Sequence, residues 1–272
     1  MKRFMKISLQ VLAIAWLPLS ALATTAQAGF TSSLGVETHF LEPGGWNVGD
    51  ALSTHQTWDY VGANTGNLPD ISYDVDGALL TNPTWSVKAP GFRTGTSNFY
   101  SFSGDFGATA DIYNHGGLPA GVGTHVIVQI GNSLNPDAES FPGQGTGVYL
   151  DSLKIVDLSG SPITGGDNAS ALQISPIFYA DEVDSSFGLV SYQELVAEFW
   201  LPGYTGDFHV DWNQKVHSLI DTLRVDSMIA TEAIGGGTPF ALTAVPEPTG
   251  AILLGIGGIG LARFVKRRRK IA

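Results

Sequence analysis

The sequence predicts an all-β protein whose body is an antiparallel, two-sheet, jelly-roll-like sandwich. Short runs rich in β-branched and aromatic residues recur along the body, and clusters of Gly, Pro, Asn or Asp separate them. The body is also rich in Gly, Thr, Ser and Asn and poor in Lys and Glu, a composition that favours strands and turns over helices. About a dozen such runs are too many for one small sheet, so we expect two sheets packed face to face.

Twelve segments are expected to form strands: 34–41, 57–61, 71–75, 84–87, 98–102, 109–113, 125–130, 148–156, 172–178, 189–201, 208–212 and 223–229. Two segments also admit a helix. Residues 191–200 have helix-forming composition, but their alternation of apolar and polar side chains favours a strand. Residues 215–223 place apolar residues at helical spacing, and both a helix and a strand stay open there.

Two short sequence similarities connect distant parts of the body. Residues 150–155 and 220–225 share the order apolar, Asp, hydroxyl, Leu, basic, β-branched, and look like the closing strand of jelly-roll domains. Residues 103–106 and 205–208 share the pattern hydroxyl-Gly-Asp-Phe. The first pair is explained equally well by an internal duplication and by two strands in similar surroundings, with Asp at the rim. We interpret the second pair as transitions from a loop into a strand.

The N-terminus has the three parts of a secretory signal peptide. Residues 1–6 are basic, residues 7–23 are predominantly apolar, and Ala26-Gln27-Ala28 places small residues at the two positions that a signal peptidase reads. We therefore expect cleavage between Ala28 and Gly29 and export of the body.

The C-terminus also has three parts. Pro246, Glu247 and Pro248 precede an apolar, glycine-containing run at 250–262, and a cluster of arginines and lysines closes the chain. The apolar run is short beside the roughly 20 residues that a membrane helix needs, but flanking residues extend it to 249–265. By the positive-inside rule the basic end stays in the cytoplasm, so we expect the body on the far side of the inner membrane.

This C-terminal pattern resembles the PEP-CTERM sorting signal of exported bacterial proteins. The resemblance implies recognition and cutting by an exosortase at Pro246, Glu247 and Pro248, in a bacterium that makes exopolysaccharide. It implies transient anchoring in the inner membrane through residues 249–265, followed by a place at the cell surface or outside the cell. The body looks like uncharacterised PEP-CTERM β-sandwich proteins, and no activity accompanies that likeness. The expected division is a signal peptide (1–28), a β-sandwich domain (29–243) and a sorting tail (244–272).

The charge of the body argues against nucleic-acid binding. The whole chain has 14 Lys and Arg and 25 Asp and Glu, and nine of the cations lie in the two targeting ends. The body keeps five cations against 24 carboxylates, a formal charge of −19. A protein with so few cations cannot neutralise phosphates. Cysteine is absent, so the fold must be stabilised by its own core.

No catalytic motif is visible, and we expect no enzyme activity. The six histidines form no close metal-ligand pair, and neither a nucleophile elbow nor a phosphate-binding loop occurs. Glu194 and Glu198 share one face of a strand or of a helix, and a secreted glycan-active enzyme with these paired carboxylates is the less favoured alternative. We expect this pair to form a solvated rim instead.

Calcium is the one candidate ion, and no other cofactor is expected. Asp70, Asp74 and Asp76, followed by Gly77, concentrate the hard oxygen ligands that calcium prefers, although an EF-hand is not formed. Aromatic residues offer a second kind of site, because flat rings stack on sugars, but tryptophan in a sandwich is more often in the core. The candidates for such a sugar platform are Trp46, Trp58, Tyr60, Trp85, Trp200 and Trp212.

From the sequence we therefore expect a structural or adhesive protein of an exopolysaccharide matrix. Its expected partners are signal peptidase and exosortase during export, and then exopolysaccharide. The alternative function is a carbohydrate- or calcium-binding β-sandwich module.

Overall fold

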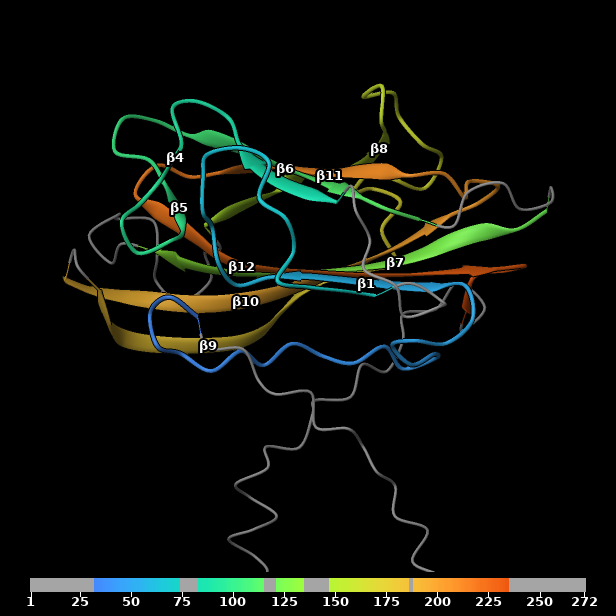
Figure 1. The fold of residues 1–272 in the computed structure, drawn as a ribbon, viewed down its shortest axis with the longest axis horizontal. Coiled ribbons are helices and arrows are strands. Elements are labelled where there is room, and N and C mark those ends of the chain that lie inside the picture. Colours follow the sequence, from blue (N-terminus) through green and yellow to red (C-terminus); the bar gives the residue numbers. More distant parts are fainter. Residues whose placement is uncertain (1–31, 74–82, 115–120, 135–146, 186–187, 235–272) are drawn as a thin grey trace, which may run out of the picture.

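The computed structural model describes residues 32–73, 83–114, 121–134, 147–185 and 188–234. Within these ranges the chain forms strands in two antiparallel sheets and no helix, so the prediction of an antiparallel all-β body is confirmed (Figure 1). The predicted signal peptide and sorting tail lie outside the described residues. Among the residues described, we find no helix with the length and apolar character that a bilayer crossing requires.

The larger sheet has the strand order β2-β1-β12-β7-β10-β9, and β5 pairs with β12 and also with β4. Its strands are β1 (Ser53–Trp58), β2 (Ile71–Tyr73), β4 (Phe92–Arg93), β5 (Phe99–Tyr100), β7 (Gly123–Leu134), β9 (Gln173–Ser185), β10 (Gly188–Leu201) and β12 (Ser218–Ala230). The smaller sheet has the order β3-β6-β11-β8. Its strands are β3 (Thr84–Val87), β6 (Phe106–Ile112), β8 (Val148–Asp157) and β11 (Phe208–Gln214).

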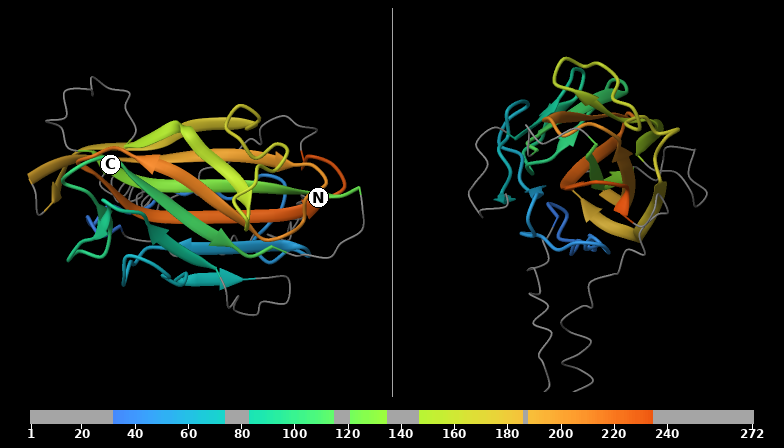
Figure 2. Two further views of the ribbon diagram at one scale, coloured as in Figure 1. Left: turned by 90° about the horizontal axis from the view of Figure 1, so that it is seen from above. Right: turned by 90° about the vertical axis from the view of Figure 1, so that its right-hand side faces the viewer.

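The two sheets enclose the main apolar core, and the end-on view of Figure 2 shows the strands arranged around the space between them. Buried and part-exposed residues alternate along β6 and β11, because one face of the smaller sheet packs on the core while the other meets solvent. Trp85 contacts Phe99 edge-on at 4.8 Å between ring centroids, and Trp58 at 6.4 Å. Truncating a buried ring of this size to alanine typically costs about 3–5 kcal/mol.

The larger sheet is buried on both faces. Strand β12 and most of β10 are buried residue after residue, a pattern that requires cover on each side. The smaller sheet covers the inner face. Residues 32–50, which we call the covering segment, run across the outer face and appear in blue beneath β1, β9 and β10 in Figure 1.

Side chains of the sheet bind the backbone of the covering segment. The amide of Gln129 donates to the carbonyl of Leu41 at 2.9 Å and accepts the N–H of the same residue at 2.6 Å. The carboxylate of Glu194 accepts the N–H of His39 at 2.8 and 3.1 Å. The ring of Trp46, 4% exposed, packs into the same face. Gln129 and Glu194 therefore form hydrogen bonds with an extended chain in place of water.

This arrangement corrects one predicted strand. Residues 34–41 form no strand of either sheet; they lie over the larger sheet and are bound by its side chains. The ambiguity at 215–223 is resolved in favour of a strand. Residues 215–217 form a turn, in which His217 has a φ of 59°, and β12 begins at Ser218. The choice of a strand for 191–200 is confirmed as part of β10.

The repeated hydroxyl-Gly-Asp-Phe pattern has a structural explanation. Each Phe begins a strand, Phe106 in β6 and Phe208 in β11, as predicted. These strands are antiparallel neighbours, and each Asp accepts the N–H of a residue just beyond the partner strand. Asp105 accepts from Val216 at 2.9 Å, and Asp207 accepts from Asn114 at 2.8 Å.

The other sequence similarity does not reflect similar surroundings. Residues 150–155 lie in β8 of the smaller sheet, whereas residues 220–225 lie in β12 of the larger sheet. Asp151 is exposed, while Asp221 is fully buried. The interpretation of both aspartates as rim residues is therefore wrong for Asp221.

Candidate functional site

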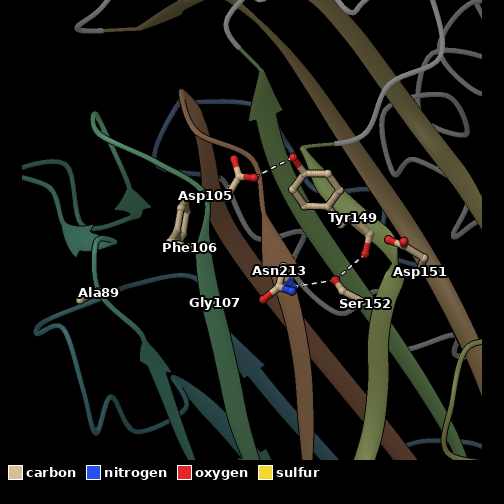
Figure 3. A pocket seen from close by; sticks show the side chains of 8 residues that line it. All are labelled: Ala89, Asp105, Phe106, Gly107, Tyr149, Asp151, Ser152 and Asn213. Carbon is tan, nitrogen blue, oxygen red and sulfur yellow. Dashed lines mark hydrogen bonds between the residues drawn. The ribbon is translucent and has the colours of Figure 1, made fainter.

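An open groove lies on the solvent-facing side of the smaller sheet, with a volume of about 460 Å³. Strands β6, β8 and β11 contribute to it, together with the segment before β4 (Figure 3). Its lining residues are Ala89, Asp105, Phe106, Gly107, Tyr149, Asp151, Ser152 and Asn213. None of these residues was among the candidates from the sequence.

A local irregularity of the sheet shapes the groove. Lys154 pairs with Asp211 and Tyr149 pairs with Asn213, so four residues of β8 face a single residue of β11. Ser152 satisfies the interrupted backbone bonding: its hydroxyl accepts the N–H of Asn213 at 2.7 Å and donates to the carbonyl of Tyr149 at 2.6 Å. Bulges of this kind redirect side chains and recur beside functional sites.

Tyr149 is held in place within the groove. Its hydroxyl donates to Oδ2 of Asp105 at 2.8 Å, and Oδ1 of Asp105 accepts the N–H of Val216. The ammonium of Lys215 lies 5.5 Å from the centre of the Tyr149 ring, within range of a cation–π interaction. The hydrogen bond to Asp105, then burial and the charge of Asp105, raise the pKa of the Tyr149 phenol. The phenol therefore remains a protonated donor across the physiological range.

These groups together suit a polyhydroxylated ligand. Figure 3 shows the ring of Tyr149 between the carboxyl groups of Asp105 and Asp151, with the amide of Asn213 nearby. A part-exposed ring offers an apolar face to the C–H groups of a sugar, and carboxylate and amide oxygens accept hydrogen bonds from hydroxyls. Gly107 has no side chain, and Lys88 and Asn213 lie over its backbone: a Cβ atom there would be 3.1 Å from Cδ of Lys88 and 3.6 Å from Oδ1 of Asn213.

The predicted calcium ligands are only partly described. Asp70 is exposed, and its Oδ2 accepts the N–H groups of Asp59 and Tyr60 at 2.8 and 3.0 Å. Burial, then the hydrogen bond and charge of Asp70, raise the pKa of Asp59 to about 7. Asp74 and Asp76 lie outside the described residues. Within the described ranges no three His, Cys, Asp or Glu side chains come together as metal ligands, and calcium binding stays a prediction.

Glu194 and Glu198 do not form the solvated rim that was expected. Both are fully buried beneath the covering segment, so that expectation is wrong. Oε1 of Glu198 lies 2.7 Å from Nε2 of His125, and burial raises the pKa of Glu194 to about 7 despite the N–H of His39. The pair lies on the opposite side of the molecule's core from the groove, and the covering segment separates it from solvent.

A chain of buried charges lies on the same outer face. The guanidinium of Arg224 donates to both oxygens of Glu42 at 2.9 Å and to Asp226 at 2.7 Å. The other oxygen of Asp226 lies 2.6 Å from Nδ1 of His55. Because Arg224, Asp226 and His55 are almost completely buried, these groups connect the covering segment to β12 and β1 and offer no open binding surface.

The tryptophans are mainly core residues. Trp46, Trp58, Trp85 and Trp212 are at most 4% exposed, and Trp200 is only partly exposed. Of the six proposed platform residues, Tyr60 alone is largely exposed. A sugar platform made from these tryptophans is therefore not formed, and Tyr149 is the ring that the groove presents. Its position beside Asp105 depends on a contact across 44 residues, for which the local sequence holds no signal.

No protein-family model, no curated protein and no solved structure matches this chain.

Proposed function

We propose that this protein is an exported surface or extracellular protein that binds polysaccharide in the groove of its smaller sheet. Its role is then structural or adhesive, within an exopolysaccharide matrix. The observation that carries the proposal is the arrangement of Tyr149 with Asp105, Asp151 and Asn213 in an open groove. The strand order β1-β12-β7-β10 opposite β6-β11-β8 supports the finer assignment of a jelly-roll-like sandwich.

The charges near the groove select the class of glycan. Asp105 and Asp151 are both exposed carboxylates, and the body as a whole is strongly acidic. Two cations, Lys215 over Tyr149 and Lys88 over Gly107, also lie at the groove, but the strongly acidic body repels uronic-acid polymers and favours neutral or amino-bearing polysaccharides. Neutral sugars offer hydroxyl donors to the carboxylates, and an amino sugar adds a favourable charge.

The test is affinity electrophoresis of the exported protein in gels that contain one polysaccharide each. Hydroxyethyl cellulose, mixed-linkage β-glucan, mannan and galactan serve as neutral probes, glycol chitosan as an amino probe and alginate as an acidic probe. We expect retardation by at least one neutral or amino polymer, and a loss of at least tenfold in affinity for Tyr149→Ala, about 1.4 kcal/mol.

Tyr179→Ala is the matched control, because Tyr179 is half exposed on β9 of the other sheet. It should leave the affinity unchanged. Migration unaffected by every neutral and amino polymer would overturn the proposal, as would equal losses for the two tyrosine variants.

Sorting through the C-terminal tail is a separate part of the proposal, and it rests on the sequence. Intact-mass measurement of the protein recovered from the envelope and the medium should give a product that begins at Gly29 and ends near residues 246–248. A mass that retains the basic residues 266–270 would instead mean a permanently anchored protein, and would contradict exosortase processing.

A further inference from the structure

An exposed aromatic cluster lies beside the groove. It consists of Phe92, Tyr100 and Phe102, from β4, β5 and the segment after β5. The rings of Phe92 and Phe102 are stacked, with 5.7 Å between centroids and an interplanar angle of 25°. Tyr100 contacts Phe102 edge-on at 4.7 Å and is 6% exposed, whereas Phe102 is 54% exposed. The cluster therefore presents a flat apolar face supported by a buried ring.

The cluster is built on paired strands. Phe92 and Tyr100 face one another in the β4–β5 register, and β5 pairs with β12. The hydroxyl of Tyr100 lies 3.1 Å from Nδ1 of His217, and the backbone N–H of His217 donates to the carbonyl of Ser101. These bonds hold the rings in one arrangement, which lowers the entropy lost when a ligand stacks on them.

Two chain segments lead directly from the groove to the cluster. In the first segment, Ala89 lines the groove. The backbone of Gly91 lies so close to the ring of Phe106 that a Cβ atom on residue 91 would be 2.6 Å from Cδ2 of Phe106. Phe92 follows immediately.

The second segment is the turn at 215–217. Lys215 lies over Tyr149, the N–H of Val216 donates to Asp105, and His217 contacts Tyr100. Every residue of this turn thus contacts either the groove or the cluster.

We propose that the aromatic cluster is a second sugar-stacking subsite, continuous with the groove, and that the protein binds a glycan chain along both. This inference rests on the proposed function and names the form of its ligand: a polymer chain of several sugar units, bound along its length. Stacked rings suit the flat faces of pyranose units, and the polar ring of His217 lies beside them, 6.3 Å from the Tyr100 ring between centroids. A ligand that is apolar on its faces and polar at its edges fits this setting better than an apolar protein surface does.

The test is calorimetric titration of the full-length exported protein with oligosaccharides of two to eight units. Cello-oligosaccharides are used if a glucan is retained in the gels, manno- or galacto-oligosaccharides if mannan or galactan is, and chito-oligosaccharides if glycol chitosan is. Affinity should rise with chain length until the chain spans both subsites. Phe102→Ala should lower the affinity for the longest chains by about fivefold to tenfold and leave the shortest unchanged. Phe102→Trp, which keeps a stacking face, should restore the length dependence.

Leu158→Ala is the control, because Leu158 is also 54% exposed but follows the far end of β8. It should bind every oligosaccharide as the unmodified protein does. Tyr149→Ala should weaken all lengths alike. If the protein binds but Phe102→Ala keeps the full length dependence, the second subsite is wrong and the groove stands; if nothing binds, the proposed function itself fails. A change in sedimentation coefficient for Phe102→Ala would assign the cluster to contact between two copies and overturn the inference.

Discussion

Replacing Arg224 with methionine is expected to lower the free energy of unfolding by about 3–5 kcal/mol, the typical cost of removing one partner from a buried ion pair. The Arg224 guanidinium is 3% exposed and binds Asp226, whose carboxylate is fully buried. Burial alone would raise the pKa of Asp226, but the charges of Arg224 and His55 outweigh it and hold that pKa below its usual value. Without the arginine, the buried Asp226 carboxylate must either stay charged with too little positive charge beside it or take up a proton.

The loss should extend to the covering segment. Arg224 also binds Glu42 through two parallel hydrogen bonds, so the variant removes an anchor of residues 32–50 from the larger sheet. We expect faster amide hydrogen exchange at Leu41, whose N–H is bonded to Gln129, in addition to the shift of the urea midpoint.

Lys88→Met is the matched control for charge and size. Lys88 forms an ion pair with Asp211 at 3.6 Å, but its side chain is 58% exposed, and surface pairs of this kind contribute about 0–1 kcal/mol. Urea unfolding of both variants at one pH compares them directly. Losses of similar size in Arg224→Met and Lys88→Met would show that the buried charges are not a principal support of the fold.

The second large effect is a dependence of stability on pH that is opposite to ordinary acid denaturation. Burial is the main cause that raises the pKa of Glu194 from 4.5 to about 7, that of Asp59 from 3.8 to about 7 and that of Asp221 from 3.8 to about 6. Each group therefore binds its proton more tightly in the folded state. Its stabilising contribution is complete below the unfolded pKa and is lost as pH rises through the folded pKa. The free energy of unfolding should fall as pH rises from about 4.5 to 7 or 8.

Below this window the sign reverses. Asp226 has a folded pKa below 3.8, so its contribution is present above that pH and is lost as the pH falls further. We therefore expect maximal stability near pH 4 to 5. For Glu194 the shift corresponds to about 3 kcal/mol, an order-of-magnitude figure at about 1.4 kcal/mol per pKa unit.

Glu194→Gln isolates this contribution. The glutamine oxygen still accepts the N–H of His39, but it carries no proton-linked charge. Urea unfolding at pH 5 and pH 8 should show a smaller difference for the variant, mainly because it is more stable at pH 8. Glu37→Gln, an exposed change on the same covering segment, should keep the full difference. An unchanged pH dependence in Glu194→Gln would assign the effect to other groups.

Local patterns were sufficient for most of the sheet structure. Strands such as 208–212 alternate apolar and polar residues because one face of the smaller sheet packs on the core and the other meets solvent. The tryptophans were expected mainly in the core because tryptophan in a sandwich is more often a core residue, and four of them lie there. The targeting signals at the two ends are also patterns of composition along the chain, and they remain predictions from the sequence.

Other features depend on contacts between residues that are far apart in the chain. An extended stretch of mixed apolar and polar residues such as 34–41 has the same local pattern whether it pairs in a sheet or lies across one. The difference was decided by Gln129 and Glu194, which lie 88 and 155 residues from their backbone partners. The same cover buries Glu194 and Glu198, whose charge had suggested solvent.

The groove illustrates the same division. The sequence by itself determined an acidic, cysteine-free, all-β body, and it predicts a targeting signal at each end. Only the tertiary structure placed Tyr149 against Asp105 and brought the Phe92–Phe102 pair beside them. The physical reason is that strand periodicity specifies which face a side chain occupies, whereas its neighbours on that face are set by the order and register of strands, which long-range packing decides.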